Sequence, residues 1–346
     1  MVFKFKNKIK YSFIIPVHNN SQSLEICLNS IKKQINYQSE IIIIDDCSTQ
    51  PKIKDIANKY AAKFLRLTKN CGAGRARNYG VKIARGKYLI FIDSDVIVPT
   101  GFFKKLLKRI KTLPVNTCLQ GVYGLTTPIK NIFSQYKNLY YYHNFFHRIK
   151  GNNFYYLSSH CFIIPKRIFN KLKGFNSKIK TVIEDADLSY RLLKNNYKVI
   201  LDRTLIVSHY KDFSLTSLLI NDAKLSFAKI KHLLRNLVKD DKDKLIVVSG
   251  GRIKEIYPLI LNTLITPLLL IFFLLSLFFH KTILFFIILL TVFLCLNADF
   301  FQFISKIKKN WIIVLKIIFI FYLDMLFAFL GVILGAVDYY FLGKKY

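Results

Sequence analysis

The chain has 346 residues, 52% of them hydrophobic, and its 53 Lys and Arg against 20 Asp and Glu give a formal net charge of +33. With only 14 Gly and 8 Pro, this composition excludes a disordered or collagen-like protein. The length fits about two structural units. Apolar residues run almost continuously through 256–342 but alternate with polar ones before that, which predicts a soluble domain followed by a membrane anchor.

The positive charge is compatible with two anionic partners, nucleic acid and the surface of a membrane. The Lys and Arg residues are spread along the chain instead of forming one cluster, and Ile, Asn, Phe and Tyr are abundant beside them. This pattern favours the membrane surface as the partner and argues against nucleic acid. A membrane-tethered nucleic-acid-binding protein remains the alternative from another class of function.

The six cysteines include no CxxC pair and no zinc-ligand spacing, as expected for reduced thiols in a cytosolic compartment. The N-terminus is basic but lacks the apolar stretch of about 7 to 15 residues that a signal peptide needs. We therefore expect a multi-pass protein of the cell membrane with its first domain in the cytoplasm.

Apolar runs and helical periodicities alternate in the first hundred residues, which predicts a parallel sheet covered on both faces. Ligands bind such sheets beyond the carboxyl ends of the strands, where several polar residues fall: His18, Asp45, Asp46, Asp93 and Asp95. The predicted strands are 11–17, 41–44, 64–67 and 88–92, and the predicted helices are 23–34, 51–62 and 74–84.

The second half of the chain predicts the attachment to the membrane. Residues 214–238 form a basic amphipathic helix, suited either to the membrane surface or to packing on a domain. Hydrophobic segments follow at 256–279, 282–304 and 311–337, each long enough to cross a bilayer. The predicted domains are therefore 1–212, an interfacial helix and linker at 213–255, and an anchor of about three segments at 256–346.

Basic residues near the third segment leave its topology open. Lys306, Lys308 and Lys309 precede it and place that loop in the cytoplasm by the positive-inside rule. A single crossing by the third segment would then put Lys344 and Lys345 outside. A re-entrant or interfacial third segment is the alternative.

Carboxylates are scarce, yet seven of the 20 cluster in three short windows. Like charges held together need a cation or a raised pKa, so the clusters indicate metal binding and acid–base chemistry. Asp93-Ser94-Asp95 directly follows an apolar strand, where a hard cation such as Mg²⁺ or Mn²⁺ could bridge a carboxylate to a diphosphate. The other windows are Asp45-Asp46 and Glu184-Asp185-Ala186-Asp187.

Six segments in consistent order between residues 11 and 211 resemble glycosyltransferase family 2, the inverting enzymes with the GT-A fold, of the membrane-anchored bacterial type. They are PVHNN at 16–20, IIIIDDCST at 41–49, NCGAGRARNYG at 70–80, GKYLIFIDSD at 86–95, IIPKRIFNKLKGFN at 163–176 and EDADLSYRL at 184–192. The resemblance implies an α/β, Rossmann-like nucleotide-sugar-binding domain followed by C-terminal transmembrane helices.

The same resemblance implies roles for individual residues. Asp185 matches the catalytic base, and Asp95 and Asp93, with His209, match the holders of a divalent metal, Mn²⁺ or Mg²⁺. Glu184, Asp187 and Arg191 would support the acceptor side. The implied nucleotide-binding residues are Pro16, His18, Asn19, Asp46, Arg77, Asn78 and Asp93.

Several of these residues also have purely structural readings. His18 could cap a turn, and Glu184 and Asp187 could cap the helix that begins there, since acidic residues suit a helix N-terminus. Arg191 could pair with one of those carboxylates, and His209 could be structural.

The groups present fit a single displacement at a sugar carbon. Metal and nearby cations would stabilise a departing diphosphate, while a carboxylate would accept the proton of an acceptor hydroxyl. We therefore expect transfer of a sugar from a nucleotide sugar to a hydroxyl of a membrane-associated glycan or glycolipid, in the synthesis of a cell-envelope polysaccharide. The expected nucleotide of the donor is UDP. A polyprenyl-phosphate glycosyltransferase, whose anionic acceptor needs no base, is the alternative.

Overall fold

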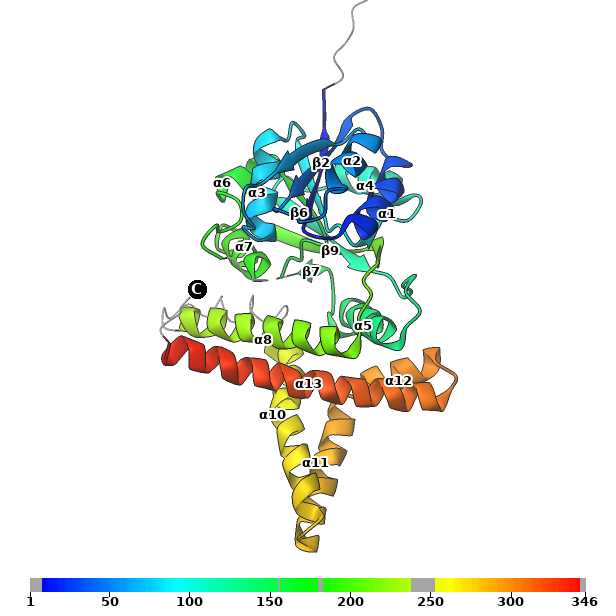
Figure 1. The fold of residues 1–346 in the computed structure, drawn as a ribbon, viewed down its shortest axis with the longest axis vertical. Helices are drawn as coiled ribbons and strands as arrows, with labels where there is room; N and C mark the ends of the chain where they lie inside the picture. The colour runs from blue at the N-terminus through cyan, green and yellow to red at the C-terminus, as the bar shows by residue number, and fades with distance from the viewer. Residues whose placement is uncertain (1–7, 155, 180–182, 238–252, 343–346) are drawn as a thin grey trace, which may run out of the picture. The chain divides into compact units, whose positions relative to one another are not determined.

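The computed structural model describes residues 8–154, 156–179, 183–237 and 253–342 (Figure 1). The chain forms two compact units. Unit 1 comprises Met1–Pro128 and Gly151–Lys211, and unit 2 comprises Ile129–Lys150 and Asp212–Lys345. The short segment 129–150, which interrupts unit 1 in sequence, therefore belongs to unit 2. The predicted domain boundary at residue 212 assigns residues 129–150 to the first domain instead.

The first half of unit 1 is a parallel sheet, as predicted. Its strands lie in the order β3-β2-β1-β4, and β1 pairs with β2 from Tyr11 opposite Ser39 to Val17 opposite Asp45. Every residue of β1 after Tyr11 is buried, which explains why the strand reads as a continuous apolar run. The elements are β1 (Tyr11–Val17), α1 (Ser21–Lys32), β2 (Ser39–Asp45), α2 (Ile53–Lys59), β3 (Lys63–Arg66), α3 (Ala73–Ile83) and β4 (Tyr88–Ile92).

The second half turns the sheet into a mixed one. β8 lies between β4 and β6 and is antiparallel to both, while β6 and β9 are parallel to each other. The prediction of a parallel sheet thus holds for the first four strands only. The further elements are β5 (Val96–Ile97), α4 (Phe102–Lys111), β6 (Thr117–Tyr123), β7 (Asn153–Phe154), β8 (Cys161–Pro165), α6 (Lys166–Lys171), α7 (Glu184–Lys194) and β9 (Lys198–His209).

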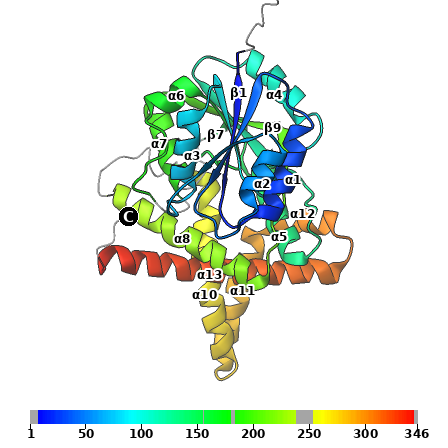
Figure 2. The same ribbon diagram turned by 45° about the horizontal axis from the view of Figure 1, so that its top comes forward.

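Helices cover both faces of this sheet (Figure 2). α1, α2 and α4 lie on one face, and α3, α6 and α7 lie on the other (Figures 1 and 2). The packing of α3 is close because Gly80 has no side chain. A Cβ atom at Gly80 would lie 2.5 Å from Ile44 Cδ1 and 2.8 Å from Ile14 Cγ2. This contact holds the second half of α3 close against β1 and β2.

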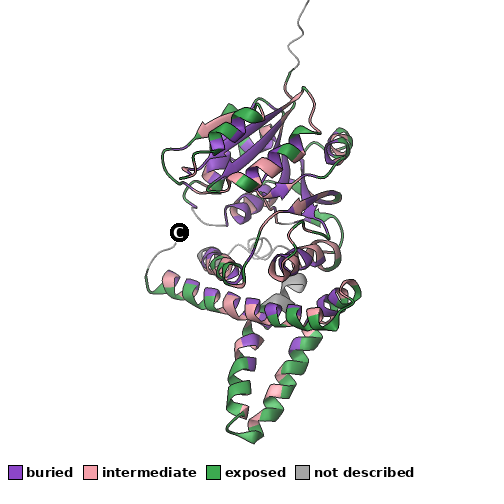
Figure 3. Cartoon of the chain, turned by 45° about the vertical axis from the view of Figure 1, so that its right-hand side comes forward, coloured by how far each residue is buried: buried purple, intermediate pink, exposed green. Residues whose placement is uncertain are grey.

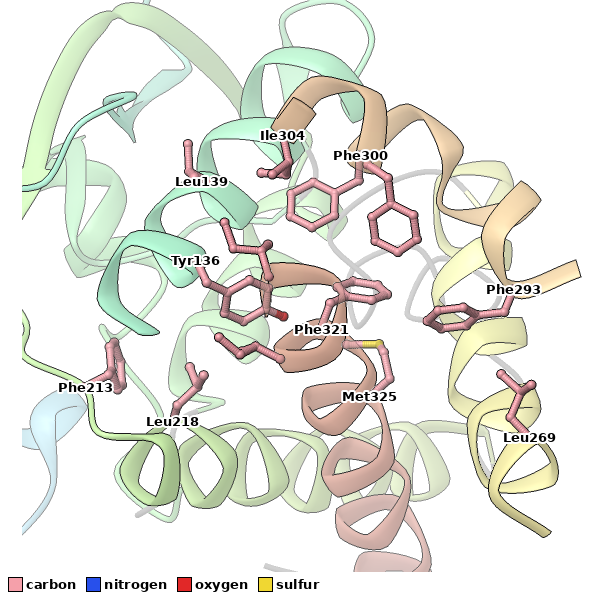
Figure 4. Close-up of a cluster of buried hydrophobic side chains, with 13 residues drawn as sticks. Tyr136, Leu139, Phe213, Leu218, Leu269, Phe293, Phe300, Ile304, Phe321 and Met325 are labelled. Atoms are coloured by element: carbon pink, nitrogen blue, oxygen red, sulfur yellow. The ribbon is translucent and has the colours of Figure 1, made fainter. Parts of the chain in front are cut away.

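Unit 2 is helical and has a core of its own (Figure 4). Aromatic residues dominate that core, including Tyr136, Phe293, Phe300 and Phe321. The predicted amphipathic helix appears as α8, and the predicted linker at 239–255 lies outside the described residues up to 252. The elements are α5 (Ile132–His143) with a π-helical turn η1 (Asn144–Arg148), α8 (Leu215–Leu237), α10 (Ile253–Ser276), η2 (His280–Thr282), α11 (Ile283–Leu296), α12 (Ala298–Ile307) and α13 (Trp311–Tyr340).

Fewer helices than the predicted three are long and apolar enough to span a membrane. In the described part of the chain, α13 alone is long and apolar enough, with a mean hydropathy of 2.6 over its best 18 residues. Two further helices, His280–Leu296 and Ala298–Ile307, reach the length of a span only when they are counted as one. They bend by 65° at the break between them. The predicted segment 282–304 is therefore two helices, and the apolar stretch Ile260–Ser276 is shorter than a typical span.

Candidate functional site

The turn after β4 places the Asp93-Ser94-Asp95 carboxylates at the edge of the sheet. β5 follows at once and pairs with the end of β9, so that Val96 lies opposite His209. This pairing brings Asp95 Oδ2 within 3.7 Å of His209 Nε2. Burial opposes ionisation of Asp95, but the charges of His209 and Lys211 outweigh it and lower the pKa of this carboxyl. Asp95 is therefore held as a carboxylate beside an imidazole nitrogen.

Arg77 connects this turn to the acidic start of α7. Its side chain is 3% exposed and packs over the ring of Phe175, at 5.6 Å from the centroid. One terminal nitrogen donates to Asp93 Oδ1 at 2.6 Å, and the other donates to Glu184 Oε1 at 3.0 Å. Burial outweighs the attraction of Arg77 and raises the pKa of Glu184. The guanidinium thus fixes two carboxylates that lie 91 positions apart in sequence.

Asp185 presents one carboxylate oxygen that no other described residue holds. Its Oδ2 accepts hydrogen bonds from the backbone N–H of Ser159 at 2.9 Å and from the Ser159 hydroxyl at 3.1 Å. Its Oδ1 is buried and has no partner among the described residues. Burial and the neighbouring Glu184 raise the pKa of Asp185 to about 7, against the opposing effect of Arg77. A carboxyl with these properties is suited to accept a proton near neutral pH.

A stack of aromatic rings lies beside the pair Asp95 and His209. Tyr123, the last residue of β6, stacks on His160 with ring centroids 4.1 Å apart and contacts His209 at 4.7 Å. Burial, together with the charge of His209, lowers the pKa of His160 to about 3, so its ring stays neutral. Since His160 directly follows the Ser159 that holds Asp185, the stack links the two halves of the site.

The residues predicted to bind the nucleotide near β1 and β2 share one loop region. The His18 ring nitrogen Nδ1 lies 2.8 Å from the carbonyl oxygen of Asp46, and the rest of the ring is exposed. Asp46 accepts from the backbone N–H groups of Cys71 and Gly72, so it fixes the turn that starts α3. Asn19 accepts from the N–H and hydroxyl of Thr49. Pro16 is buried within β1.

Three of the predicted site residues make structural contacts. Asn78 donates to the carbonyl oxygen of Phe175 at 2.8 Å and accepts from its N–H at 2.9 Å. Asp187 and Arg191 pair with each other at 2.7 Å along α7, one turn apart. The structure therefore brings together Arg77, Asp93, Asp95, Glu184, Asp185 and His209, and it uses Asn78, Asp187 and Arg191 to hold neighbouring segments.

The protein groups fit a small divalent cation only in part. In the described ranges no three His, Cys, Asp or Glu side chains gather around one point. Asp95 and His209 supply two donors 3.7 Å apart, a separation that two ligands of one ion can have. Mg²⁺ commonly takes one or two carboxylates and completes its shell with phosphate oxygens and water. The pair fits an ion that arrives with a diphosphate.

Sequence reasoning missed the residues that hold the site from behind. Ser159 is the partner of Asp185, and Gln120 orders the same loop by accepting from the N–H of Ser158 at 2.7 Å. Tyr123 and His160 form the ring stack. The only signal was the polar run Ser158-Ser159-His160 directly before the apolar strand β8, and its meaning depends on a pairing that sequence order does not show.

Comparisons with known proteins identify relatives of the first half of the chain. The family model "Glycosyl transferase family 2" matches residues 12–173. The uncharacterized glycosyltransferase EpsJ of Bacillus subtilis is 35% identical over 102 residues, which are 28% of this chain and 29% of that protein. A poly(ribitol-phosphate) beta-glucosyltransferase of Bacillus spizizenii is 38% identical over 95 residues, 25% of this chain and 15% of that protein. The chain thus spans less than a third of either relative.

A solved structure has the same fold. The mannosyltransferase of Pyrobaculum calidifontis, in complex with GDP-Man and Mn²⁺, superposes with a TM-score of 0.51 at 16% identity, covering 67% of this chain and 65% of that one. The mixed α/β sheet, the carboxylates beyond β4 and the match of the family model agree with one another. Residues 12–173 therefore match a family 2 glycosyltransferase domain, and the fold around them is of the GT-A type.

Proposed function

We propose that the protein transfers a sugar from a nucleotide sugar to a hydroxyl group of a membrane-associated glycan or glycolipid, with inversion at the sugar carbon. The observation that carries this proposal is the environment of Asp185. One of its oxygens is fixed by Ser159, the other has no partner within the described ranges of the chain, and burial raises the pKa of the carboxyl to about 7. A base within reach of an acceptor hydroxyl contributes about 10² to 10⁴ in rate.

The opposite side of the site is suited to the donor. His18 has an exposed ring beside the Asp46 backbone, where a nucleotide base could stack. Arg77 places positive charge next to Asp93, but its two terminal nitrogens already hold carboxylates, so we assign it to ordering the site. Asp95 and His209 would hold a divalent metal, Mg²⁺ or Mn²⁺, which when bound neutralises charge on the departing diphosphate.

In the proposed reaction Asp185 accepts the proton of the acceptor hydroxyl while the acceptor oxygen attacks the anomeric carbon. The bond from that carbon to the diphosphate breaks, and the nucleoside diphosphate leaves with the bonding electrons. Ser159 holds the carboxyl in position through Oδ2, which leaves Oδ1 to accept the proton. Attack and departure on opposite faces of the sugar carbon give inversion.

A matched pair of variants tests the role of Asp185. Asp185→Asn keeps the shape and the hydrogen bond from the Ser159 N–H, but it removes the base. Asp187→Asn, two residues later on α7, removes a carboxylate that pairs with Arg191 instead. Membranes containing each protein are incubated with a panel of UDP-, GDP- and dTDP-sugars, and nucleoside diphosphate release is measured.

We expect Asp185→Asn to lose at least 10²-fold in turnover and Asp187→Asn to stay within a few-fold of the parent. Binding of the donor, measured by calorimetry, should survive in both. Turnover of Asp185→Asn near the parent rate would remove Asp185 as the base, and it would favour a polyprenyl-phosphate acceptor that is already anionic.

A further inference from the structure

We infer that unit 2 enters the lipid bilayer through the α10–α11 hairpin alone, while α13 lies in the plane of the membrane surface beside α8. The two ends of the α8–α13 layer then stay on one side of the membrane. Length and composition alone indicate the opposite, because among the described helices α13 is the one that is long and apolar enough to span a membrane. It rests on unit 2 alone and does not depend on the proposed glycosyl transfer.

The side chains of α13 divide into two faces along the whole helix. A buried stripe runs from Ile317 to Tyr339 at helical spacing. The opposite face is exposed and largely apolar, with Trp311 at 69%, Phe319 at 60% and Leu334 at 60%, and it also carries the exposed Lys316. One face is therefore covered by protein along its length, while the other offers apolar side chains, as in helices that lie in a membrane interface.

The buried face of α13 packs against α8 with the two backbones in contact. A Cβ atom at Gly331 would lie 2.1 Å from the Ala223 carbonyl oxygen, and one at Gly335 would lie 2.6 Å from the Phe227 carbonyl oxygen. Because 331 meets 223 and 335 meets 227, the helices run side by side in the same direction. Figure 1 shows this arrangement. Whatever position α8 takes relative to the bilayer, α13 must share it.

α8 is unsuited to cross a bilayer. Its 23 residues include Asp222, Lys224, Lys229 and Lys231. Lys224 is exposed, so it would face hydrocarbon in a spanning helix. A charged side chain at the centre of a bilayer costs about 2.5 to 3.5 kcal/mol even on the mildest scale. A basic amphipathic helix is instead typical of the membrane surface, where anionic lipids attract it.

The contacts at the middle of α13 agree with this placement. Asp324 is fully buried and accepts a hydrogen bond from the Tyr136 hydroxyl at 2.6 Å. Lys137 pairs with Asp222 and lies 3.8 Å from Asp324. If α13 crossed the membrane, this ion cluster and its helices α5 and α8 would lie at the midplane. In the surface plane the cluster stays buried within unit 2 and outside the hydrocarbon core.

The α10–α11 hairpin has the opposite character, because it is exposed along most of its length (Figure 3) and its exposed side chains from Ile260 onward are mostly apolar. Its hydroxyl groups donate to carbonyl oxygens of their own segment, such as Thr291 to Ile287 and Ser276 to Phe273. Hydroxyls in transmembrane helices are satisfied in this way. Exposed apolar residues continue to the tip, where Phe278 is 80% exposed. Between residues 263 and 296 the ionisable side chains besides Cys295 are His280 and Lys281, both at the tip.

A polar pair marks the base of the hairpin, and the helix between this pair and the tip is long enough to reach deep into a bilayer. Asn262 and Asn297 are both buried and exchange two amide hydrogen bonds of 2.8 Å. At 1.5 Å per residue, the helical path from Asn262 to Ser276, the last residue of α10, is about 21 Å, or some two thirds of the roughly 30 Å of the hydrocarbon core. The turn that follows carries Lys281, whose long side chain can extend towards the far headgroups, and Asn297 ends the returning helix α11.

The single tryptophan of the chain makes a depth measurement possible, because Trp311→Phe gives a background without tryptophan. In that background one new tryptophan is placed at each of three exposed positions: Phe319→Trp and Leu330→Trp on α13, and Leu270→Trp in the middle of α10. The full-length proteins are reconstituted into vesicles of phosphatidylcholine with phosphatidylglycerol. The lipids carry bromine at a shallow or at a deep position of the acyl chain, and quenching is compared.

We expect positions 319 and 330 to be quenched alike and more by the shallow bromines, and position 270 to be quenched more by the deep ones. A spanning α13 would separate 319 and 330 by about 16 Å in depth, because they are 11 residues apart. Unequal quenching of that pair would overturn the in-plane placement. Absence of deep quenching at position 270 would overturn the insertion of the hairpin.

Discussion

The buried carboxyl of Asp185 makes a prediction about stability that is separate from catalysis. Its pKa is raised from 3.8 to about 7, chiefly by burial, so the folded protein holds a proton that the unfolded chain releases above pH 4. Stability falls with rising pH wherever the folded state binds more protons. The loss begins near pH 4, continues to about pH 7 and then stops.

The size of the effect follows from the interval between the two pKa values. About 3 pH units at 1.36 kcal/mol each give a loss on the order of 4 kcal/mol in the free energy of unfolding. Asp185→Asn cannot ionise and should escape this loss. Relative to the parent, the variant should therefore gain stability between pH 4.5 and pH 8, which at roughly 2 to 4 °C per kcal/mol amounts to about 10 °C in Tm.

Circular dichroism is the suitable assay, because the only tryptophan lies in unit 2 and does not report on unit 1. The Tm of the parent and of Asp185→Asn is measured from pH 4.5 to 8.5. Asp187→Asn serves as the control and should not reproduce the widening gap. A difference between parent and Asp185→Asn that stays constant over this range would refute the reasoning about burial.

Three further outcomes are expected. Ser159→Ala removes one donor to the Asp185 carboxylate, worth about 1 kcal/mol, so the pH at which kcat/KM is half-maximal should rise by about 0.7; an unchanged pH profile would contradict the contact. Asp95→Ala should abolish the increase in Tm that UDP with Mn²⁺ gives, whereas Asp55→Ala on the exposed side of α2 should keep it. Gly80→Ala should lower the free energy of unfolding by about 1 to 3 kcal/mol, since its Cβ would overlap Ile44; a change below about 0.5 kcal/mol in thermal or chemical unfolding would show that α3 moves freely.

The sequence predicts the part of the fold in which neighbours in the chain are neighbours in space. The strands at 11–17 and 88–92 were predicted with their observed bounds because each is a short apolar run between polar turns. The position of β8 between β4 and β6 is not predicted, because no local sequence pattern tells which strands will be its neighbours. The same limit explains Ser159, whose role depends on α7, some 26 residues away.

In the candidate site, residue type was a better guide than motif membership. The acidic clusters at 93–95 and 184–185 do come together. The Arg77 guanidinium joins them by donating to Asp93 and to Glu184. Asn78 lies next to Arg77 in the same motif, yet its side chain binds the backbone of Phe175. Its predicted contact with the nucleotide stays a prediction, as do the individual roles of His18 and Asn19.

The assignment of α5 to unit 2 has a consequence for the order of synthesis. Tyr136 leaves the ribosome 188 residues before Asp324, its hydrogen-bond partner. At the usual 5 to 20 residues per second, α5 waits on the order of 10 to 40 s before the last helix exists. Lys137 meets Asp222 after 85 residues, but the Tyr136 hydroxyl and the apolar face of α5 lack their α13 partners for the whole interval, so this helix is the part of the nascent chain most exposed to wrong contacts.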